Sequence, residues 1–338
     1  MTPLLTGGAG YIGSHMAIAL IERGIIPVIV DNLSNSNLST LDRIEKITGK
    51  RPPFYHTDIR DTATLTKILH DHKVTSIIHF AALKSVSESV ADPLAYYANN
   101  IDGLISVLSA MNAMHLKTLI YSSSATVYAP SRTENFTLEK AFIETAPFGP
   151  INPYGQTKAM GEQIVKDWAA ATLGTQSAIL RYFNPVGAHP SGLIGEIPQG
   201  TPNNLMPYIC HVAAKKRPVL TIFGNDYATK DGTTIRDYVH VCDVVDAHLR
   251  VLENLTEPNS PSIFNIGTGI GYSVHDIIKT FESVNAVTIA TQIGPRRKGD
   301  AACVVADVSK INADLGWRAQ YSLADMCRRA WQFEKNRP

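Results

Sequence analysis

The chain has 338 residues, of which 44% are hydrophobic and 18% are charged. This balance supplies enough apolar side chains for a sizeable core and excludes wholesale disorder. With 31 basic and 30 acidic residues the net charge is +1, so global charge favours neither a nucleic-acid nor a membrane partner, and we expect neither.

The four cysteines lie far apart and form no Cys-x-x-Cys pair, so we expect reduced thiols and no metal site. The N-terminus shows no basic stretch followed by a cleavable apolar run. The apolar run at residues 16–30 is broken by Glu22, Arg23 and Gly24, which does not fit a membrane-spanning helix. A cytoplasmic location is therefore expected.

The first half of the chain alternates strand-like and helix-like segments, the pattern of parallel βα units. Gly24 is a natural end for the first helix, and the apolar run after it predicts a strand buried on both faces. The expected strands are 3–6, 25–30, 74–80, 117–122 and 177–182, and the expected helices are 11–23, 93–114 and 152–171. These elements predict a Rossmann-like, doubly wound parallel α/β sheet.

The regular alternation of strand-like and helix-like segments ends after residue 184. Residues 185–202 are rich in glycine and proline and are expected to form a loop. Short strands are then expected at 219–223, 262–266 and 287–292, with helices at 243–255 and 273–284. We expect two domains, 1–184 and a smaller mixed α/β lobe at 185–338. Part of residues 235–260 is the segment that would return to the first domain and pack on its sheet.

The strongest local signal is the glycine loop at residues 6–13, which follows a strand and opens a helix. Its glycines permit a tight turn in which backbone N–H groups approach a pyrophosphate at a helix N-terminus. The next strand ends at Asp31, whose carboxylate can accept bonds from an adenosine ribose and would repel a 2′-phosphate. This favours NAD over NADP as the cofactor. An ordinary tight turn and a turn-capping role for Asp31 are the alternatives.

Tyr154 and Lys158 are four residues apart and share one face of a predicted helix. A lysine ammonium beside a phenol lowers the phenol's pKa, which would make Tyr154 a proton acceptor from a hydroxyl group. Ser124 ends a central strand, at the edge where such sheets bind ligands. A surface Tyr–Lys pair is the alternative, and the glycine loop and the serine together favour catalysis.

These motifs resemble the extended short-chain dehydrogenase/reductase family, and the similarity spans nearly the whole chain. The segments that carry the resemblance to the sugar-nucleotide 4-epimerases of this family are 7–15, 31–34, 122–128, 182–185, 223–227 and 236–241. The resemblance implies NAD-dependent inversion at C4 of UDP-hexoses, UDP-galactose to UDP-glucose, through a transient 4-keto sugar. Tyr154 would take the 4-hydroxyl proton, Ser124 would bond the same oxygen, and Lys158 would bind the nicotinamide ribose.

The resemblance, with the strand ends already described, also indicates the binding residues. The expected NAD-binding residues are Gly7, Gly10, Tyr11, Ile12, Gly13, Asp31, Asn32, Ser36, Asp58, Ile59, Phe80, Ala81, Ala82, Lys84, Asn99, Ser122, Tyr154, Lys158 and Tyr182. The expected substrate-binding residues are Lys84, Ser124, Tyr154, Asn184, Asn204, Leu205, Leu220, Phe223, Arg236, Tyr238, Arg297, Asp300 and Val304. Asn99 is further expected to support the loop at 80–84. Arg236 and Arg297 would clamp the diphosphate, because guanidinium binds phosphate oxygens in a fork geometry.

Some features depart from the family pattern or leave choices open. Ala82 stands where the family usually has glycine, and the segment 130–149 looks lengthened. Val304 would border the hexose C2 group, where valine leaves room for an N-acetyl group, so UDP-N-acetylhexosamines are candidate substrates as well. A homodimer formed through two helices per subunit is implied, and retention of NAD between turnovers is expected from the chemistry.

The same sequence features also bear on alternative functions. Residues 125–127 carry no acid, which disfavours the dehydratases and decarboxylases of the family. A UDP-glucuronate 4-epimerase and a non-enzymatic NAD-binding sensor remain the alternatives.

Overall fold

A computed structural model describes residues 1–129, 141–297 and 300–337. Its internal contacts group the chain into two compact units, each described by itself below. The first comprises Met1–Val127, Phe148–Arg181 and Val245–Phe264, and the second comprises Tyr128–Pro147, Tyr182–Val244 and Asn265–Pro338. The domain limits expected near residue 184 stay a prediction.

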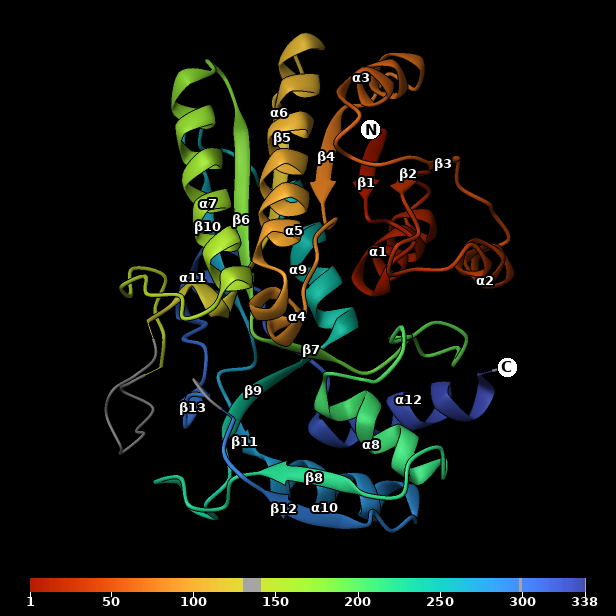
Figure 1. The fold of residues 1–338 in the computed structure, drawn as a ribbon. Coiled ribbons are helices and arrows are strands. Elements are labelled where there is room, and N and C mark those ends of the chain that lie inside the picture. The colour runs from red at the N-terminus through yellow and green to blue at the C-terminus, as the bar shows by residue number, and fades with distance from the viewer. Residues whose placement is uncertain (130–140, 298–299, 338) are drawn as a thin grey trace. The chain divides into compact units, whose positions relative to one another are not determined.

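The first unit is organised around a seven-stranded sheet in the order β10-β6-β5-β4-β1-β2-β3 (Figure 1). Its strands are β1 Pro3–Thr6, β2 Val28–Asp31, β3 Phe54–His56, β4 Ser76–His79, β5 Thr118–Ser124, β6 Gln176–Tyr182 and β10 Ser262–Ile266. The pairs β1–β2, β1–β4, β2–β3 and β4–β5 are parallel. Every residue of β1, β2 and β4 is buried, as expected for strands covered on both faces. The predicted Rossmann-like α/β fold is confirmed.

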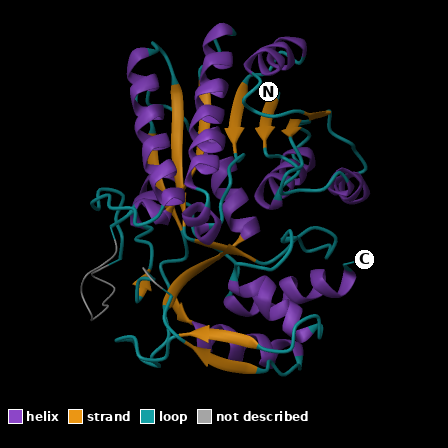
Figure 2. Ribbon diagram, viewed as in Figure 1, coloured by secondary structure: helices purple, strands orange, loops and turns teal. Residues whose placement is uncertain are grey.

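Helices cover this sheet (Figure 2). They are α1 Tyr11–Glu22, α2 Ser39–Thr48, α3 Thr62–Asp71, α4 Val86–Ala91, α5 Pro93–Tyr97, α6 Gly103–Ala113 and α7 Pro153–Ala171, with α9 Val241–Glu253 running from the second unit into the first. Helix α6 contacts α3 and α7, and α7 contacts β5. The core between helices and strands includes Leu4, Val30, Leu104, Val107 and Leu119.

The long helix predicted at 93–114 is interrupted. Between α5 and α6 the backbone forms a π-helical turn, η1 Ala98–Asp102, which adds one residue to the helical turn. Gly103 follows it, and a Cβ there would lie 2.4 Å from Cδ1 of Ile59, so a larger residue would require the Ile59 side chain to shift. The π-turn holds Asn99 and Asn100, two polar residues in a mainly apolar helix.

The second unit holds two small sheets. One has the order β11-β9-β13, with β7 also paired to β9, and the other pairs β8 with β12. The strands are β7 Asn184–Val186, β8 Leu220–Phe223, β9 Ile235–His240, β11 Gly271–Ser273, β12 Thr291–Gly294 and β13 Cys303–Val304. The helices are α8 Leu205–Ala213, α10 Val274–Asn285, α11 Ser309–Leu315 and α12 Leu323–Asn336. Apolar residues of α8, α10 and α12, among them Ile209, Phe281 and Met326, form its core.

One expected strand belongs elsewhere. Residues 262–266 were expected in the smaller lobe, but they form β10 at the edge of the seven-stranded sheet. The strand β10 belongs to the large sheet because it pairs with β6, which lies about eighty residues earlier in the sequence.

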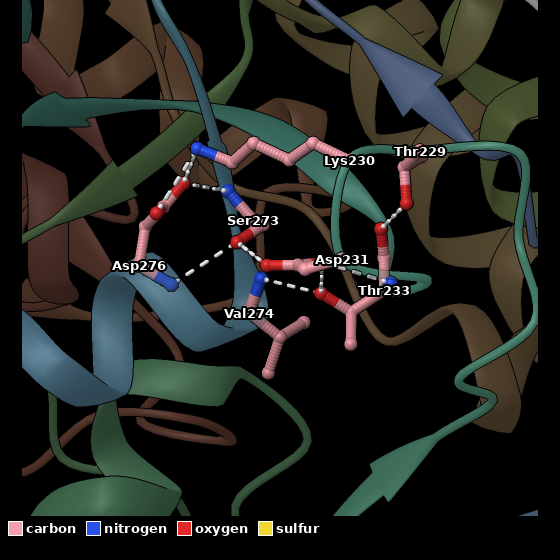
Figure 3. A network of polar contacts seen from close by, with 7 residues as sticks. All are labelled: Thr229, Lys230, Asp231, Thr233, Ser273, Val274 and Asp276. Atoms are coloured by element: carbon pink, nitrogen blue, oxygen red, sulfur yellow. Dashed lines mark hydrogen bonds and ion pairs between the residues drawn. The ribbon is translucent and has the colours of Figure 1, made fainter.

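A polar network fixes the loop that leads into β9 (Figure 3). Ser273 and Asp276 form a capping box at the start of α10. Asp231 accepts hydrogen bonds from the Ser273 hydroxyl and from both the N–H and the hydroxyl of Thr233, and Lys230 pairs with Asp276 at 2.8 Å. An ion pair and a hydrogen bond thus hold this loop against the N-terminus of α10.

The four cysteines are free, and Cys210, Cys303 and Cys327 are buried. Within the residues that the structure describes, no helix is both long enough and apolar enough to cross a membrane.

Candidate active site

The glycine loop lies between β1 and α1, and its shape depends on missing side chains. Gly7 has a φ of +65°, and a Cβ there would lie 2.8 Å from the backbone nitrogen of Ala81. A Cβ on Gly13 would lie 2.4 Å from the carbonyl oxygen of Gly7. Gly10 is the N-cap of α1, and no side chain caps this helix. The first turn, with Tyr11 and Ile12, therefore presents backbone N–H groups at a positive helix end, which is a cradle for a phosphate.

Asp31 lies at the end of β2, as predicted, and is buried. Its carboxylate accepts hydrogen bonds from the N–H of Ala9 at 3.0 Å, the N–H of Leu33 at 2.9 Å and the hydroxyl of Ser36 at 2.8 Å. The turn-capping role weighed as an alternative is thus present. It does not exhaust the carboxylate, which has about four acceptor sites and can still receive a ribose hydroxyl.

The loop after β3 is fixed by an ion pair. Arg60 donates two hydrogen bonds to Asp58 and holds the pKa of that carboxyl well below its usual value. Asn32 donates to the same carboxylate at 3.1 Å. Ile59 is buried beside Gly103. These residues bring the loops after β2 and β3 together.

The loop after β4 contains Phe80, Ala81, Ala82 and Lys84 and is held from the π-turn. Asn100 Oδ1 accepts from the N–H of Leu83 at 2.9 Å, and its Nδ2 donates to the carbonyl of Leu83 at 3.1 Å and to the hydroxyl of Thr157 at 3.0 Å.

The residue expected to support this loop was Asn99, but Asn99 only donates to Asn100. Asn100, which makes these contacts, lies in the π-turn. The signal that sequence reasoning missed is a second polar residue, buried in an apolar helix.

Ser124 and Tyr154 are brought together by the way α7 begins. Asn152 caps the helix by accepting from the N–H of Gly155 at 2.8 Å, and Pro153 follows at the first position. A Cβ on Gly155 would lie 2.6 Å from the carbonyl oxygen of Thr126, so the helix start packs directly on the chain after β5. The hydroxyl of Tyr154 is hydrogen-bonded to that of Ser124. Ser124 Oγ also accepts from the N–H and the hydroxyl of Thr126.

The pKa of Tyr154 is raised, because burial of the phenol outweighs its bond to Ser124 and the positive charge of Lys84, which both lower it. This direction is opposite to the one predicted. Lys158 is not among the groups that shift this pKa, and its ammonium donates to the carbonyl oxygen of Ser122 at 2.7 Å. Lys158 is buried, and burial lowers its pKa to about 8.

The residues expected to bind UDP lie mostly in the second unit and form three groups. Arg236 pairs with Asp300, and Val304 lies opposite Arg236 where β13 pairs with β9. Asn184 lies opposite Tyr238 where β7 pairs with β9. The Arg297 guanidinium lies 4.0 Å from the ring centroid of Phe223.

The remaining expected residues are described by the elements that hold them. Asn204 is the N-cap of α8 and donates to Glu196, and Leu205 begins that helix. Leu220 is part of the apolar core. Tyr182 is buried at the end of β6.

Arg296, the residue before Arg297, has specific partners in the structure. Its guanidinium bonds to Asp226 at 2.6 Å and lies 4.2 Å from the ring centroid of Tyr227. Both partners belong to the loop after β8, so this loop holds the residue next to Arg297. Of the lengthened segment 130–149, residues 130–140 lie outside the described part. In the rest, Phe142 stacks on Tyr128 at 5.0 Å.

Residues 3–267 match the model of a family described as the NAD dependent epimerase/dehydratase family. The chain belongs to this family.

Its relatives in this family match along their whole length. The UDP-glucose 4-epimerase of Bacillus subtilis is 46% identical over 99% of this chain and 97% of its own. Among solved structures, the UDP-glucose-4-epimerase from Stenotrophomonas maltophila, with bound NAD and formylated UDP-arabinopyranose, is 46% identical with a TM-score of 0.95, and the match covers 99% of this chain and 98% of that one. The UDP-Glc/GlcNAc 4-epimerase from Campylobacter jejuni is 34% identical with a TM-score of 0.83, and 99% of each chain is covered.

NAD is the cofactor of this family, and the first unit fits it. The glycine cradle would be filled by a Cβ at Gly7 or Gly13, and α1 lacks a side-chain cap that would compete with a phosphate. Asp31 places a buried carboxylate at the end of β2, where it can accept from a ribose and repel a 2′-phosphate.

Proposed function

We propose that this chain inverts the configuration at C4 of UDP-hexoses, interconverting UDP-galactose and UDP-glucose through a transient 4-keto sugar. The observation that carries the proposal is the hydrogen bond between the hydroxyls of Ser124 and Tyr154 at the end of β5, in a chain of this family. Two linked hydroxyls beside a buried lysine are suited to moving one proton to and from a sugar oxygen.

The protein residues have distinct roles in this reaction. Tyr154 accepts the proton of the sugar 4-hydroxyl, and Ser124 bonds to the same oxygen. Burial raises the pKa of Tyr154, while the Ser124 bond and the charge of Lys84 lower it and so favour the phenolate, the form that accepts the sugar proton. Lys158 has three N–H donors, of which Ser122 takes one, so it can also bind the nicotinamide ribose. NAD, when bound, supplies the hydride acceptor and a positive ring that favours the phenolate further.

The UDP moiety is assigned to the second unit. Arg297 presents a guanidinium stacked on Phe223, and Arg236 presents one paired with Asp300, both suited to diphosphate oxygens. Val304 lies opposite Arg236 and is small, which supports N-acetylated UDP-hexosamines as substrates alongside the plain sugars. The choice between these sugars is part of the test.

The test is incubation of the purified protein with UDP-galactose, without added NAD, followed by NMR of the products. Formation of UDP-glucose without net NADH supports both C4 inversion and a retained cofactor. Absence of conversion of UDP-galactose and UDP-N-acetylgalactosamine, even after NAD is added, overturns the proposal. Conversion of UDP-glucuronate alone would favour the carboxylated substrate. Tight binding of UDP-sugars without any turnover would favour a sensor.

We also propose a homodimer formed through helices of the first unit. Val90 on α4, Leu94 on α5, Ile105 on α6 and Met160 on α7 are exposed apolar residues, and Leu94 is 77% exposed. Helix α7 contacts α4, α5 and α6, so these residues lie on neighbouring helices. A second copy would cover them.

Light scattering after gel filtration tests the dimer. The wild-type protein is expected at twice the mass of the chain, and Leu94→Asp is expected at the mass of a monomer. Leu173→Asp, equally exposed beyond the end of α7, is the control and should remain a dimer. A monomeric wild-type protein would rule the dimer out.

A cytoplasmic location is part of the proposal. It is supported by four free cysteines, three of them buried, which is typical of chains that fold in a reducing compartment. Cell fractionation with an antibody to the chain tests it.

A further inference from the structure

Helix α7 contacts the end of β5 at three successive turns. Tyr154, Lys158 and Glu162 are spaced four residues apart on one helix face. Tyr154 bonds to the Ser124 hydroxyl, Lys158 to the Ser122 carbonyl and Glu162 to the Ser123 hydroxyl, the last at 2.6 Å. The reaction proposed above uses the first two of these helix residues and leaves Glu162 without a role.

Glu162 is a buried carboxylate that accepts hydrogen bonds from both Ser123 and Arg181. Arg181 on β6 donates two hydrogen bonds to it, at 2.8 and 2.7 Å, and neither side chain is more than 1% exposed. The Arg181 guanidinium also lies 4.8 Å from the ring centroid of Phe148. A buried ion pair costs desolvation energy that apolar residues would avoid, so stability alone is a weak explanation for it.

The groups that face Lys158 come from several elements. Glu162 lies on α7, Tyr121 on β5 and His79 on β4, and the Lys158 ammonium lies 5.1 Å from the ring centroid of Tyr121. Burial and the charge of Lys158 lower the pKa of His79 to about 3, so the imidazole is neutral at pH 7. Burial and the charge of Glu162 keep the Tyr121 phenol protonated.

Among these neighbours Glu162 is therefore the one whose charge favours the ammonium, and it opposes the effect of burial on Lys158. Arg181 holds the Glu162 side chain in place through its two hydrogen bonds. The packing is close, because a Cβ on Gly161 would lie 2.1 Å from the Tyr121 hydroxyl oxygen.

We propose that Glu162, held by Arg181, is a positioning residue that keeps the Lys158 ammonium charged and fixes the serine-rich end of β5 through Ser123. The inference rests on the proposed function, in which the Lys158 ammonium binds the nicotinamide ribose beside Tyr154. In this proposal the buried ion pair of Glu162 and Arg181 touches neither substrate nor cofactor, and it acts on the reaction through Lys158 and Ser123.

Two measurements test this. The first is the pH dependence of kcat for UDP-galactose in the wild-type protein, Glu162→Gln and Ser123→Ala. Glu162→Gln removes the charge and keeps the shape, so the alkaline limb of the profile should move down by about one pH unit. Ser123→Ala removes the hydrogen bond and keeps the charge, so its limb should stay in place while kcat falls. An unchanged limb in Glu162→Gln overturns the proposal.

The second measurement is independent of activity. NMR titration of lysine labelled with ¹³C at Cε, with the Lys158 signal assigned from Lys158→Arg, gives the protonation of Lys158 directly. A lower titration midpoint in Glu162→Gln supports the inference even if the wild-type protein converts no UDP-hexose, and an equal midpoint overturns it even if it does. If Glu162→Gln does not fold, the double variant Glu162→Gln/Arg181→Gln, which leaves an amide pair, is titrated against Arg181→Gln, so that the two proteins differ only in the charge of residue 162 and the same two outcomes apply.

Discussion

The ammonium of Lys158 donates a 2.7 Å hydrogen bond to the backbone carbonyl of Ser122, so a helix side chain and a strand backbone are joined at the level of the candidate site. The carbonyl cannot be removed by substitution, and it holds the ammonium where the proposed reaction would use it. Two hydrogens of the ammonium remain for other acceptors. The positions of Ser124, Tyr154 and Lys158 are consequently set by the packing of α7 on β5.

Tyr154→Phe removes the proposed proton acceptor and little volume. We expect kcat for UDP-galactose to fall by about 10² to 10⁴-fold, the usual contribution of general acid–base catalysis, with KM little changed. Steady-state kinetics measure both. Tyr55→Phe, which removes a tyrosine hydroxyl bonded to His72 beside β3, is the matched control and should keep its activity. Near-normal turnover by Tyr154→Phe would refute its role in proton transfer.

Asp31→Asn exchanges an acceptor for a group that also carries N–H donors. Its partners Ala9, Leu33 and Ser36 are donors too, so the glycine loop should lose order, and the ribose should lose a charged acceptor. We expect NAD affinity to fall by about 10 to 100-fold, the worth of a hydrogen bond to a charged group, and the preference over NADP to shrink. Isothermal titration of the NAD-free protein measures both affinities. Asp42→Asn, on the exposed face of α2, should change neither.

His79 makes the fold sensitive to acid. Its pKa is lowered to about 3 by burial and by the charge of Lys158, against 6.5 for the free side chain. Between these values the unfolded chain binds a proton that the native protein does not. The free energy of unfolding should therefore fall as the pH falls from 6.5 towards 3, by about 1.4 kcal/mol per pH unit from this group.

Urea unfolding at pH 7, 5.5 and 4.5 measures that slope. His79→Gln keeps an amide that can bond to Thr6 and should lose the contribution, so its slope should be shallower. His70→Gln, on the exposed side of α3, serves as the control and should retain the wild-type slope. Parallel slopes for wild type and His79→Gln would show that other groups cause the acid sensitivity.

Val304→Tyr tests the substrate range. The family resemblance places Val304 beside C2 of the hexose, and a tyrosine at such a position would crowd a group on C2. Turnover of UDP-N-acetylgalactosamine should fall by about tenfold or more relative to UDP-galactose, the scale on which a pocket rejects an oversized group. The ratio of the two kcat/KM values is the measurement. Val304→Ala should leave the ratio near that of the wild-type protein, and an equal loss on both sugars would count against this role.

Much of the first unit could be predicted because its signals are local. The period of apolar residues identifies the central strands and α1, and the glycines at 7, 10 and 13 mark a turn whose backbone tolerates no side chain at two of them. The spacing of Tyr154 and Lys158 follows from the pitch of one helix. The contact of Tyr154 with Ser124 needs only that α7 packs on β5.

Other features depend on contacts distant in sequence. The strand β10 joins the large sheet through β6, and no local pattern distinguishes it from a strand of the smaller unit. The pKa of Tyr154 is raised by burial, whereas a Tyr–Lys spacing describes only the nearby charge. The role of Asn100 depends on a π-turn, which changes the helix register without changing the apolar pattern enough to be recognised.

The π-turn Ala98–Asp102 also determines where the chain from Pro93 to Ala113 can change in length. A π-turn holds one residue more than an α-helical turn. Deleting one residue inside it restores a continuous α-helix, and α5 and α6 keep the faces that they bury. A deletion inside α6 instead turns the residues that follow it by about 100° relative to α5, which would move a buried residue such as Met111 out of the core. The π-turn can therefore lose one residue without a change in the register between α5 and α6. Such a deletion would, however, release the loop that Asn100 holds.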